Sequence, residues 1–201
     1  MATIALPSVF PVLQFSMLQI NNLRTFSSPY GSSENLIDLL NDCWKITLEV
    51  GISNLANAAV IEAFVNAQRG GVNTVDLYHW IRPTPRGTAN GVFTLSAPAS
   101  AGAESIAITG GGGQAGRTLL AGDVLGLTPM LLMVAANVTL DGSGNGVVFL
   151  TNRLRIAKVI GSAVIWNTPK APFRLSGVPS VVYMGSQTSS MTMDYFEAIT
   201  A

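Results

Sequence analysis

The segment Trp44-Lys-Ile-Thr-Leu-Glu-Val50 has the most regular pattern in this chain of 201 residues. Its apolar residues Trp44, Ile46, Leu48 and Val50 occupy every second position, and polar residues fill the positions between them. Successive side chains of a β-strand point to opposite faces of a sheet. The alternation therefore predicts a strand with one buried face and one wet face.

The residues that follow this strand carry the only convincing helical pattern, over about residues 55–68. One stripe at helical spacing contains Val60, Ile61, Phe64, Val65 and Gln68. Either Asn54 or Asn57 can cap the start of the helix by accepting a hydrogen bond from a first-turn N–H group. Arg69 suits the negative end of the helix dipole, and Gly70 can adopt the left-handed conformation that ends a helix.

The rest of the chain consists of short apolar runs separated by turns. A strand is predicted over residues 75–81, and the dipeptides Asp141-Gly142 and Asn145-Gly146 are typical of tight turns. The other predicted strands are residues 91–95, 105–109, 123–127, 131–140, 146–150, 156–160, 163–166, 173–175, 181–184 and 190–198. Many short strands at regular spacing favour a sandwich or a barrel.

Two proline-containing segments divide the chain into units. The first is Arg82-Pro-Thr-Pro-Arg-Gly87, and the second is Asn167-Thr-Pro-Lys-Ala-Pro172. We therefore expect a mainly β fold with a discontinuous first domain. In this interpretation residues 1–84 plus 171–201 form a β-sandwich with a helix at residues 55–69, and residues 85–170 form an inserted small β-barrel.

The composition indicates a protein with an unusually apolar surface. Charged residues make up only 11% of the chain, against about 25% in typical proteins, and the formal net charge is +0. Hydrophobic residues reach 48%, but the best apolar run, residues 130–136, is far shorter than the roughly 20 residues of a membrane span. Pro7 and Pro11 interrupt an N-terminal segment without basic residues, which makes a poor signal peptide. We expect a soluble intracellular product whose surface is covered by other subunits.

Charge and cysteine content argue against several binding functions. The densest basic group, Arg153, Arg155 and Lys158, is small for a nucleic-acid site, which needs clustered cations on phosphates. Sequence-specific nucleic-acid binding is therefore not expected. Cys43 is the only cysteine, so an internal disulfide is impossible and a structural zinc site is not expected. Its position beside Trp44 favours a buried thiol.

The stretch Gly111-Gly-Gly-Gln-Ala-Gly-Arg-Thr118 nearly matches a phosphate-binding loop, with Arg117 in the place of the lysine. Such a loop needs a long helix after it, whose N-terminus faces the phosphates. Two glycines and a proline in residues 119–129 leave no room for that helix. We expect a loop between strands, and a mobile one, because the four glycines of residues 110–113 are costly to order.

Two further candidate sites are weak. Asp141-Gly-Ser-Gly-Asn-Gly146 resembles the start of a calcium loop, but Asn152 stands where a bidentate glutamate belongs, so a hairpin turn is favoured. His79 is the only histidine, and Asp76, three residues away on a predicted strand, would point to the opposite face. We therefore predict no catalytic, cofactor-binding or metal-binding residues, and a protein that is not an enzyme.

Several segments taken together resemble a known family. In chain order they are residues 44–48, residues 58–77, Phe93-Thr-Leu95, Leu120-Ala-Gly-Asp-Val124, residues 138–146, Arg153-Leu-Arg155 and Phe173-Arg-Leu175. This order resembles tailed-bacteriophage structural proteins akin to distal tail proteins. The resemblance covers roughly residues 40–176. Thr151 and Asn152 replace a proline that is usual in the family, and the glycine run at 110–113 is longer than expected.

The resemblance implies a subunit of a homo-oligomeric ring, commonly a hexamer, in the virion tail. Such a ring joins the tail tube to the tail tip or baseplate, contacts tube and tip or hub proteins, and is assembled in the host cytoplasm. One alternative is a receptor- or carbohydrate-binding β module of the virion, for which Tyr78, Trp80 and Trp166 are the candidate stacking residues. A second alternative is a nucleotide hydrolase that uses the glycine-rich stretch.

Overall fold

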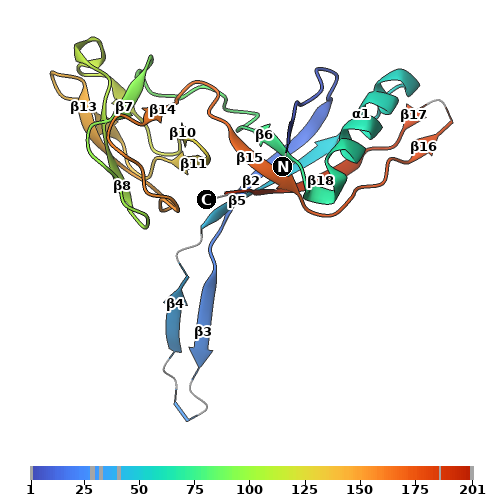
Figure 1. Ribbon diagram of the computed structural model, residues 1–201, viewed down its shortest axis with the longest axis horizontal. Helices are drawn as coiled ribbons and strands as arrows, with labels where there is room; N and C mark the ends of the chain where they lie inside the picture. The colour runs from blue at the N-terminus through green and yellow to red at the C-terminus, as the bar shows by residue number, and fades with distance from the viewer. Residues whose placement is uncertain (1, 28–29, 32–33, 40–41, 186, 200–201) are drawn as a thin grey trace.

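The computed structural model describes residues 2–27, 30–31, 34–39, 42–185 and 187–199. Its described part is mainly β with one α-helix, which confirms the predicted fold class at that level. The largest element is a six-stranded sheet (Figure 1). In spatial order its strands are β1 (Thr3–Ile4), β6 (Thr74–Leu77), β15 (Ala171–Leu175), β18 (Met191–Glu197), β5 (Cys43–Val50) and β2 (Val12–Ile20).

Strand β5 takes part in the two longest antiparallel pairings of the described residues, and its side chains alternate in burial as the sequence predicts. Residues Trp44, Ile46, Leu48 and Val50 are all buried, and the residues between them are half-buried. It pairs with β18 on one side and β2 on the other. The buried face of β5 therefore forms the centre of the first hydrophobic core.

Helix α1 (Leu55–Ala67) covers part of that buried face. The Asn54 side chain accepts a hydrogen bond from the Asn57 N–H at 2.9 Å, so Asn54 is the N-cap. At the other end Gly70 has a φ of 64°, the left-handed conformation that the sequence predicts there. Phe64 packs edge-on against Phe10, with ring centroids 5.5 Å apart.

The predicted apolar stripe of α1 is correct except at one position. Ile61, Phe64, Val65 and Gln68 are buried, whereas Val60 is 45% exposed. Val60 therefore faces solvent in this chain, because the contact with the sheet covers a narrower stripe than the sequence pattern indicates.

The segment between β6 and β15 builds a second unit around a core of its own. Its four-stranded sheet has the order β13 (Asn145–Phe149), β8 (Ser105–Thr109), β7 (Phe93–Leu95) and β14 (Ala163–Val164). Two antiparallel pairs complete the unit: β10 (Val124–Leu127) with β11 (Met130–Met133), and β9 (Thr118–Leu119) with β12 (Val138–Thr139). Within the described residues these sheets do not close into the barrel that we expected.

The two hydrophobic cores meet at the β10–β11 pair. Val124 and Leu131 are buried in the first core, whereas Leu125 and Leu132 beside them are buried in the second. Alternate side chains of one short hairpin thus serve both cores. The domain boundaries expected from the sequence stay a prediction.

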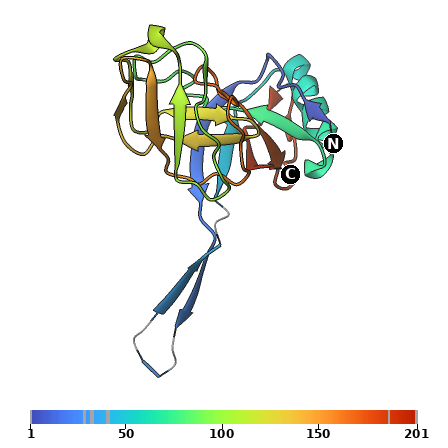
Figure 2. The ribbon, with the colours of Figure 1, turned by 60° about the vertical axis from the view of Figure 1, so that its left-hand side comes forward.

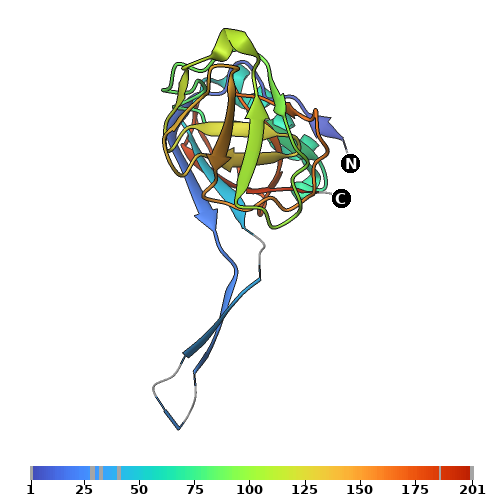
Figure 3. The ribbon, with the colours of Figure 1, turned by 90° about the vertical axis from the view of Figure 1, so that its left-hand side faces the viewer.

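A hairpin projects from this body, as Figure 1, Figure 2 and Figure 3 all show. It consists of β3 (Leu23–Ser27) and β4 (Glu34–Asp38), paired antiparallel with Leu23 opposite Asp38. It extends the β2–β5 pair, which ends with Ile20 opposite Cys43. A smaller hairpin, β16 (Tyr183–Met184) with β17 (Gln187–Thr188), lies beside α1.

Several predicted strands differ from the observed ones. The strand expected over residues 75–81 ends at Leu77, and the one expected over 131–140 is split into β11 and β12. Residues 156–160 form only a single bridge, between Lys158 and Ala99, and Val159 and Ile160 face solvent. Strands β1 to β4 were not predicted. No helix in the described part of the chain has the length and hydropathy that a membrane crossing requires.

Candidate functional site

The β3–β4 hairpin is the first candidate surface, because every residue of both strands is exposed. Leu23 and Leu36 lie on one face of the hairpin, and Phe26 and Ile37 lie on the other, since neighbouring residues alternate between faces. These four side chains are between 49% and 64% exposed. A two-stranded hairpin is marginally stable by itself. Both faces of this hairpin therefore present large apolar side chains to solvent.

The base of the hairpin is fastened to the second unit by Arg153. The guanidinium of Arg153 forms an ion pair with the Asp38 carboxylate in β4, and its Nε donates to Glu104 at 2.8 Å. The Arg153 N–H also donates to the Asp42 carboxylate at 3.4 Å. One arginine thus links the last residue of β4 to a loop of the second unit, which helps to set the direction of the hairpin.

Strand β2 is the second candidate surface, because it forms one edge of the six-stranded sheet. Edge strands carry unpaired backbone N–H and C=O groups, and proteins usually protect them with charges, prolines or bulges. The nine residues of β2 include no charge and no proline, and the only irregularity is a register shift between Val12 and Gln14. Leu13 and Leu18 are 64% and 60% exposed. The strand is therefore open to pairing with another chain.

Glu197 at the end of β18 holds the two units together. Its carboxylate accepts hydrogen bonds from the N–H of Leu131 in β11 at 2.8 Å and from the N–H of Trp44 in β5 at 3.3 Å. Arg155 donates to the same carboxylate at 2.5 Å. The indole of Trp44 adds a bond to the Leu131 carbonyl, at 2.8 Å. We call this group the Glu197 clamp.

Burial raises the pKa of Glu197 to about 7, although Arg155 and the two N–H donors oppose that shift. The side chain of Glu197 is almost fully buried, so loss of water around the carboxylate outweighs the attraction of the guanidinium. Asp42 and Cys43 also face this region, and burial raises the pKa of the Cys43 thiol. The clamp thus contains a carboxylate that changes its charge near neutral pH.

The loop before β7 is shaped by Asp123, which is buried. Its carboxylate accepts hydrogen bonds from the N–H groups of Arg86 at 2.9 Å, Gly87 at 3.2 Å and Leu120 at 3.0 Å. The φ of Gly122 is 86°, which requires glycine just before the aspartate. The Gly-Asp turn therefore holds two distant segments, residues 86–87 and 120–123, side by side.

Replacing Gly87 with alanine is expected to destabilise this loop by about 1–3 kcal/mol. An added Cβ would lie 2.2 Å from the carbonyl oxygen of Thr118, so the backbone would have to move. Chemical denaturation measures the change. Gly142→Ala is the matched control, because nothing lies within 4 Å of its Cβ. If the two variants were equally stable, the close approach of Gly87 to the Thr118 carbonyl would not require a glycine.

The glycine-rich stretch does not have the surroundings of a phosphate-binding loop. The strand before it is β8, but Gly112–Gln114 form a short 3-10 helix and β9 follows. The Gly110 N–H donates to the Gly144 carbonyl at 2.9 Å, so this stretch is bonded to the turn at residues 141–146. In that turn the Asp141 carboxylate accepts from the N–H groups of Asn145 and Ser143, which lowers the pKa of Asp141.

His79 is buried, and both of its ring nitrogens lie close to Arg82. The backbone N of Arg82 lies 3.0 Å from Nδ1, and its Nε lies 3.3 Å from Nε2, but a neutral ring can accept a hydrogen bond at only one of these two nitrogens. Burial, followed by the Arg82 charge, lowers the pKa of His79. The neutral ring that results also contacts the Phe15 ring, at 4.8 Å between centroids. Asp76, the carboxylate weighed as its partner, is exposed on β6.

The three aromatic residues considered for sugar stacking do not form one platform. Tyr78 and Trp80 stack on each other, with centroids 5.3 Å apart, and Lys170 lies 5.9 Å from the Tyr78 ring. Trp166 is buried in the second core, edge-on to Phe93. Within the part of the chain that the structure describes, no group of three or more His, Cys, Asp or Glu residues has metal-binding geometry.

Comparison with known proteins adds no assignment: no protein-family model matches the chain, and no curated protein matches it.

Proposed function

We propose that this chain is a non-enzymatic structural subunit of a tailed-bacteriophage virion, which self-associates into a ring at the distal end of the tail. The ring would join the tail tube to the tip or baseplate and contact tube and hub proteins. The proposal combines the family resemblance of residues 40–176 with the surfaces described above. Ring size is taken from the resemblance, which favours a hexamer.

Two features together support self-association. They are the unprotected edge strand β2 of the six-stranded sheet and the β3–β4 hairpin that extends from it. Strand β2 is a nine-residue edge strand without a charged side chain. The β3–β4 hairpin offers apolar side chains on both of its faces. In a protein that worked as a monomer, both features would be liabilities for aggregation. In a closed ring, each would be covered by a neighbouring subunit.

Sedimentation velocity of the purified chain tests this proposal. We expect a discrete oligomer at micromolar concentration, either alone or after mixing with the tail-tube protein of the same virion. Negative-stain images of that species are expected to show rings with a central channel. A stable monomer that is unchanged by the tail-tube protein would overturn the proposal.

A further inference from the structure

The six-stranded sheet has two edges, and they differ greatly in length. Strand β1 forms one edge with two residues, and β2 forms the other with nine. An edge strand has backbone groups on its outer side with which a further strand can pair. Two copies of the chain cannot continue one sheet from β2 to β1 over more than two residues. A second copy that covers β2 must therefore use a different strand.

The proposed ring restricts the choice further, and the present inference rests on that proposal. Neighbours in a ring meet through two different surfaces, whereas a strand that pairs with its own copy gives a two-fold dimer. The partner of β2 is therefore an exposed strand elsewhere in the chain. Among the strands of five or more residues in the described part of the chain, only β3 and β4 are exposed at every position. They form a sheet of two strands, so each is an edge strand.

The hairpin cannot cover the β2 strand of its own chain. Only Asn21 and Asn22 separate β2 from β3, and the Leu39 N–H donates to the Asn22 carbonyl at 3.0 Å, so the β2–β5 ladder continues into the hairpin. Arg153 also holds the base of the hairpin through Asp38. The hairpin therefore points away from the body, as Figure 1 and Figure 3 show, and can reach only the sheet of another copy.

The side chains of β2 and β3 are compatible on both faces of such a sheet. Phe15 and Met17 of β2 pack against the first core, and Leu18 on the opposite face is 60% exposed. Leu23 and Phe26 lie on opposite faces of β3, since they are three residues apart. An added β3 strand would therefore place an apolar side chain next to β2 on each face.

Charge distinguishes the two strands of the hairpin. Strand β4 carries Glu34 and Asp38, and charges on an edge strand oppose pairing, whereas β3 carries only Arg24 and β2 carries no charge. We propose that the β3 strand of one subunit adds to the β2 edge of the next subunit. Backbone hydrogen bonds join the two strands, and apolar contacts on both faces stabilise the pair. Repeated around a ring, this contact covers every β2 strand.

Cysteine cross-linking tests this contact. Cys43, the only cysteine, is first replaced by serine, and Ser16→Cys on β2 and Thr25→Cys on β3 are made separately in that background. An equimolar mixture is treated with a short bismaleimide under the conditions that give an oligomer. We expect at least about fivefold more cross-linked dimer than with either variant alone, because opposite residues of paired strands have Cβ atoms only about 5 Å apart.

Val147→Cys is the matched control for Thr25→Cys, because Val147 is an exposed residue of another edge strand, β13. Its mixture with Ser16→Cys is expected to give no such increase.

A charge on the edge strand gives a second measurement. Leu18→Lys is expected to weaken self-association at least about tenfold in sedimentation velocity, since lysine on an edge opposes strand pairing. Ile160→Lys adds the same charge at a similarly exposed apolar position of the second unit, 63% against 60%, and is expected to leave association unchanged.

The outcomes separate this contact from the ring proposal. An oligomer that forms without a cross-link between Ser16→Cys and Thr25→Cys, or that tolerates Leu18→Lys, would overturn the strand addition and leave the ring proposal in place. Efficient cross-linking of Ser16→Cys to itself would show a two-fold pair of β2 strands instead. A chain that stays monomeric with and without the tail-tube protein would contradict both proposals.

Discussion

Replacement of Arg155 by methionine is expected to lower the free energy of unfolding by about 3–5 kcal/mol at pH 8. Methionine keeps much of the length and apolar surface of arginine but removes the only cation that contacts the Glu197 carboxylate among the described residues. A buried carboxylate without its partner is costly because water no longer solvates it. The substitution therefore weakens the contact between β18 and β11, where the two cores meet.

The same variant is expected to lose much less stability at pH 5. The pKa of Glu197, about 7 in the folded chain, is above its ordinary value of 4.5. The folded state therefore binds this proton more tightly than the unfolded state, and the contribution of Glu197 to stability falls as pH rises from about 4.5 to 7. At pH 5 the folded chain keeps Glu197 protonated in both proteins, so the missing cation matters less.

Urea denaturation at pH 5 and pH 8 measures both effects. Glu197→Gln is the control, because glutamine keeps one acceptor for the N–H groups of Leu131 and Trp44 but does not titrate. Its stability is expected to change less than that of the unmodified protein between these pH values. A loss in Arg155→Met that is the same at both pH values would show that packing of the arginine, and not its charge, stabilises the clamp.

A charged double substitution on the hairpin, Phe26→Asp with Ile37→Asp, is expected to abolish self-association without unfolding the subunit. Both side chains are about half exposed, so in the single chain the change in stability is expected to be small, about 0.5 kcal/mol. In an assembly that covers both side chains, the burial of each one stabilises the interface by about 1.5–3 kcal/mol. Losing both corresponds to an association weaker by roughly 10²–10⁴-fold.

The double variant is compared with the unmodified protein by sedimentation velocity and thermal unfolding. Val159→Asp with Ile160→Asp is the matched control, since it adds the same two charges at exposed apolar positions of the second unit. The hairpin variant is expected to be a monomer with a normal melting temperature, and the control is expected to assemble. Assembly by both variants would remove the hairpin from the interface, and loss of assembly in both would point to net charge instead.

The elements that the sequence predicted well are those whose pattern is local. The alternation of residues 44–50 and the stripe of residues 61–68 each record which face of one element is buried. The sequences of β3 and β4 contain no such pattern, because none of their residues is buried. Strand β2 was missed because its alternation is interrupted by the register shift after Val12 and because Leu13 and Leu18 are exposed.

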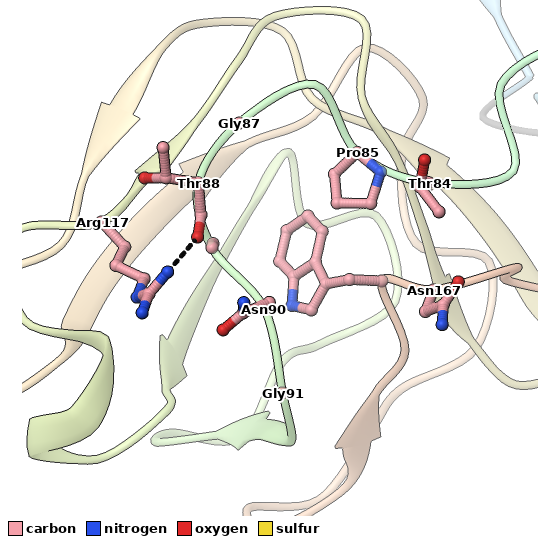
Figure 4. A pocket seen from close by; sticks show the side chains of 10 residues that line it. Thr84, Pro85, Gly87, Thr88, Asn90, Gly91, Arg117 and Asn167 are labelled. Carbon is pink, nitrogen blue, oxygen red and sulfur yellow. Dashed lines mark hydrogen bonds between the residues drawn. The ribbon is translucent and has the colours of Figure 1, made fainter.

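From the sequence, the apolar character of the candidate surfaces could be predicted, but their position in the fold could not. Low charge and high apolar content indicated a covered surface, but not which strands would form it. Arg117 belongs to a phosphate-loop pattern that the fold does not build, and its Nη1 donates to the carbonyl of Thr88, 29 residues away (Figure 4). Trp166 was a candidate stacking residue by its type alone, but the structure buries it in the second core.

The sequence by itself therefore determined the mainly β class, one helix with its cap at Asn54 or Asn57 and its end at Gly70, and the absence of room for a helix after the glycine-rich stretch. These follow from backbone preferences and periodicities that act over a few residues. Only the tertiary structure decided the Glu197 clamp and the projecting hairpin. Their contacts join residues as far as 153 positions apart, and which distant groups meet depends on how whole strands pair and pack.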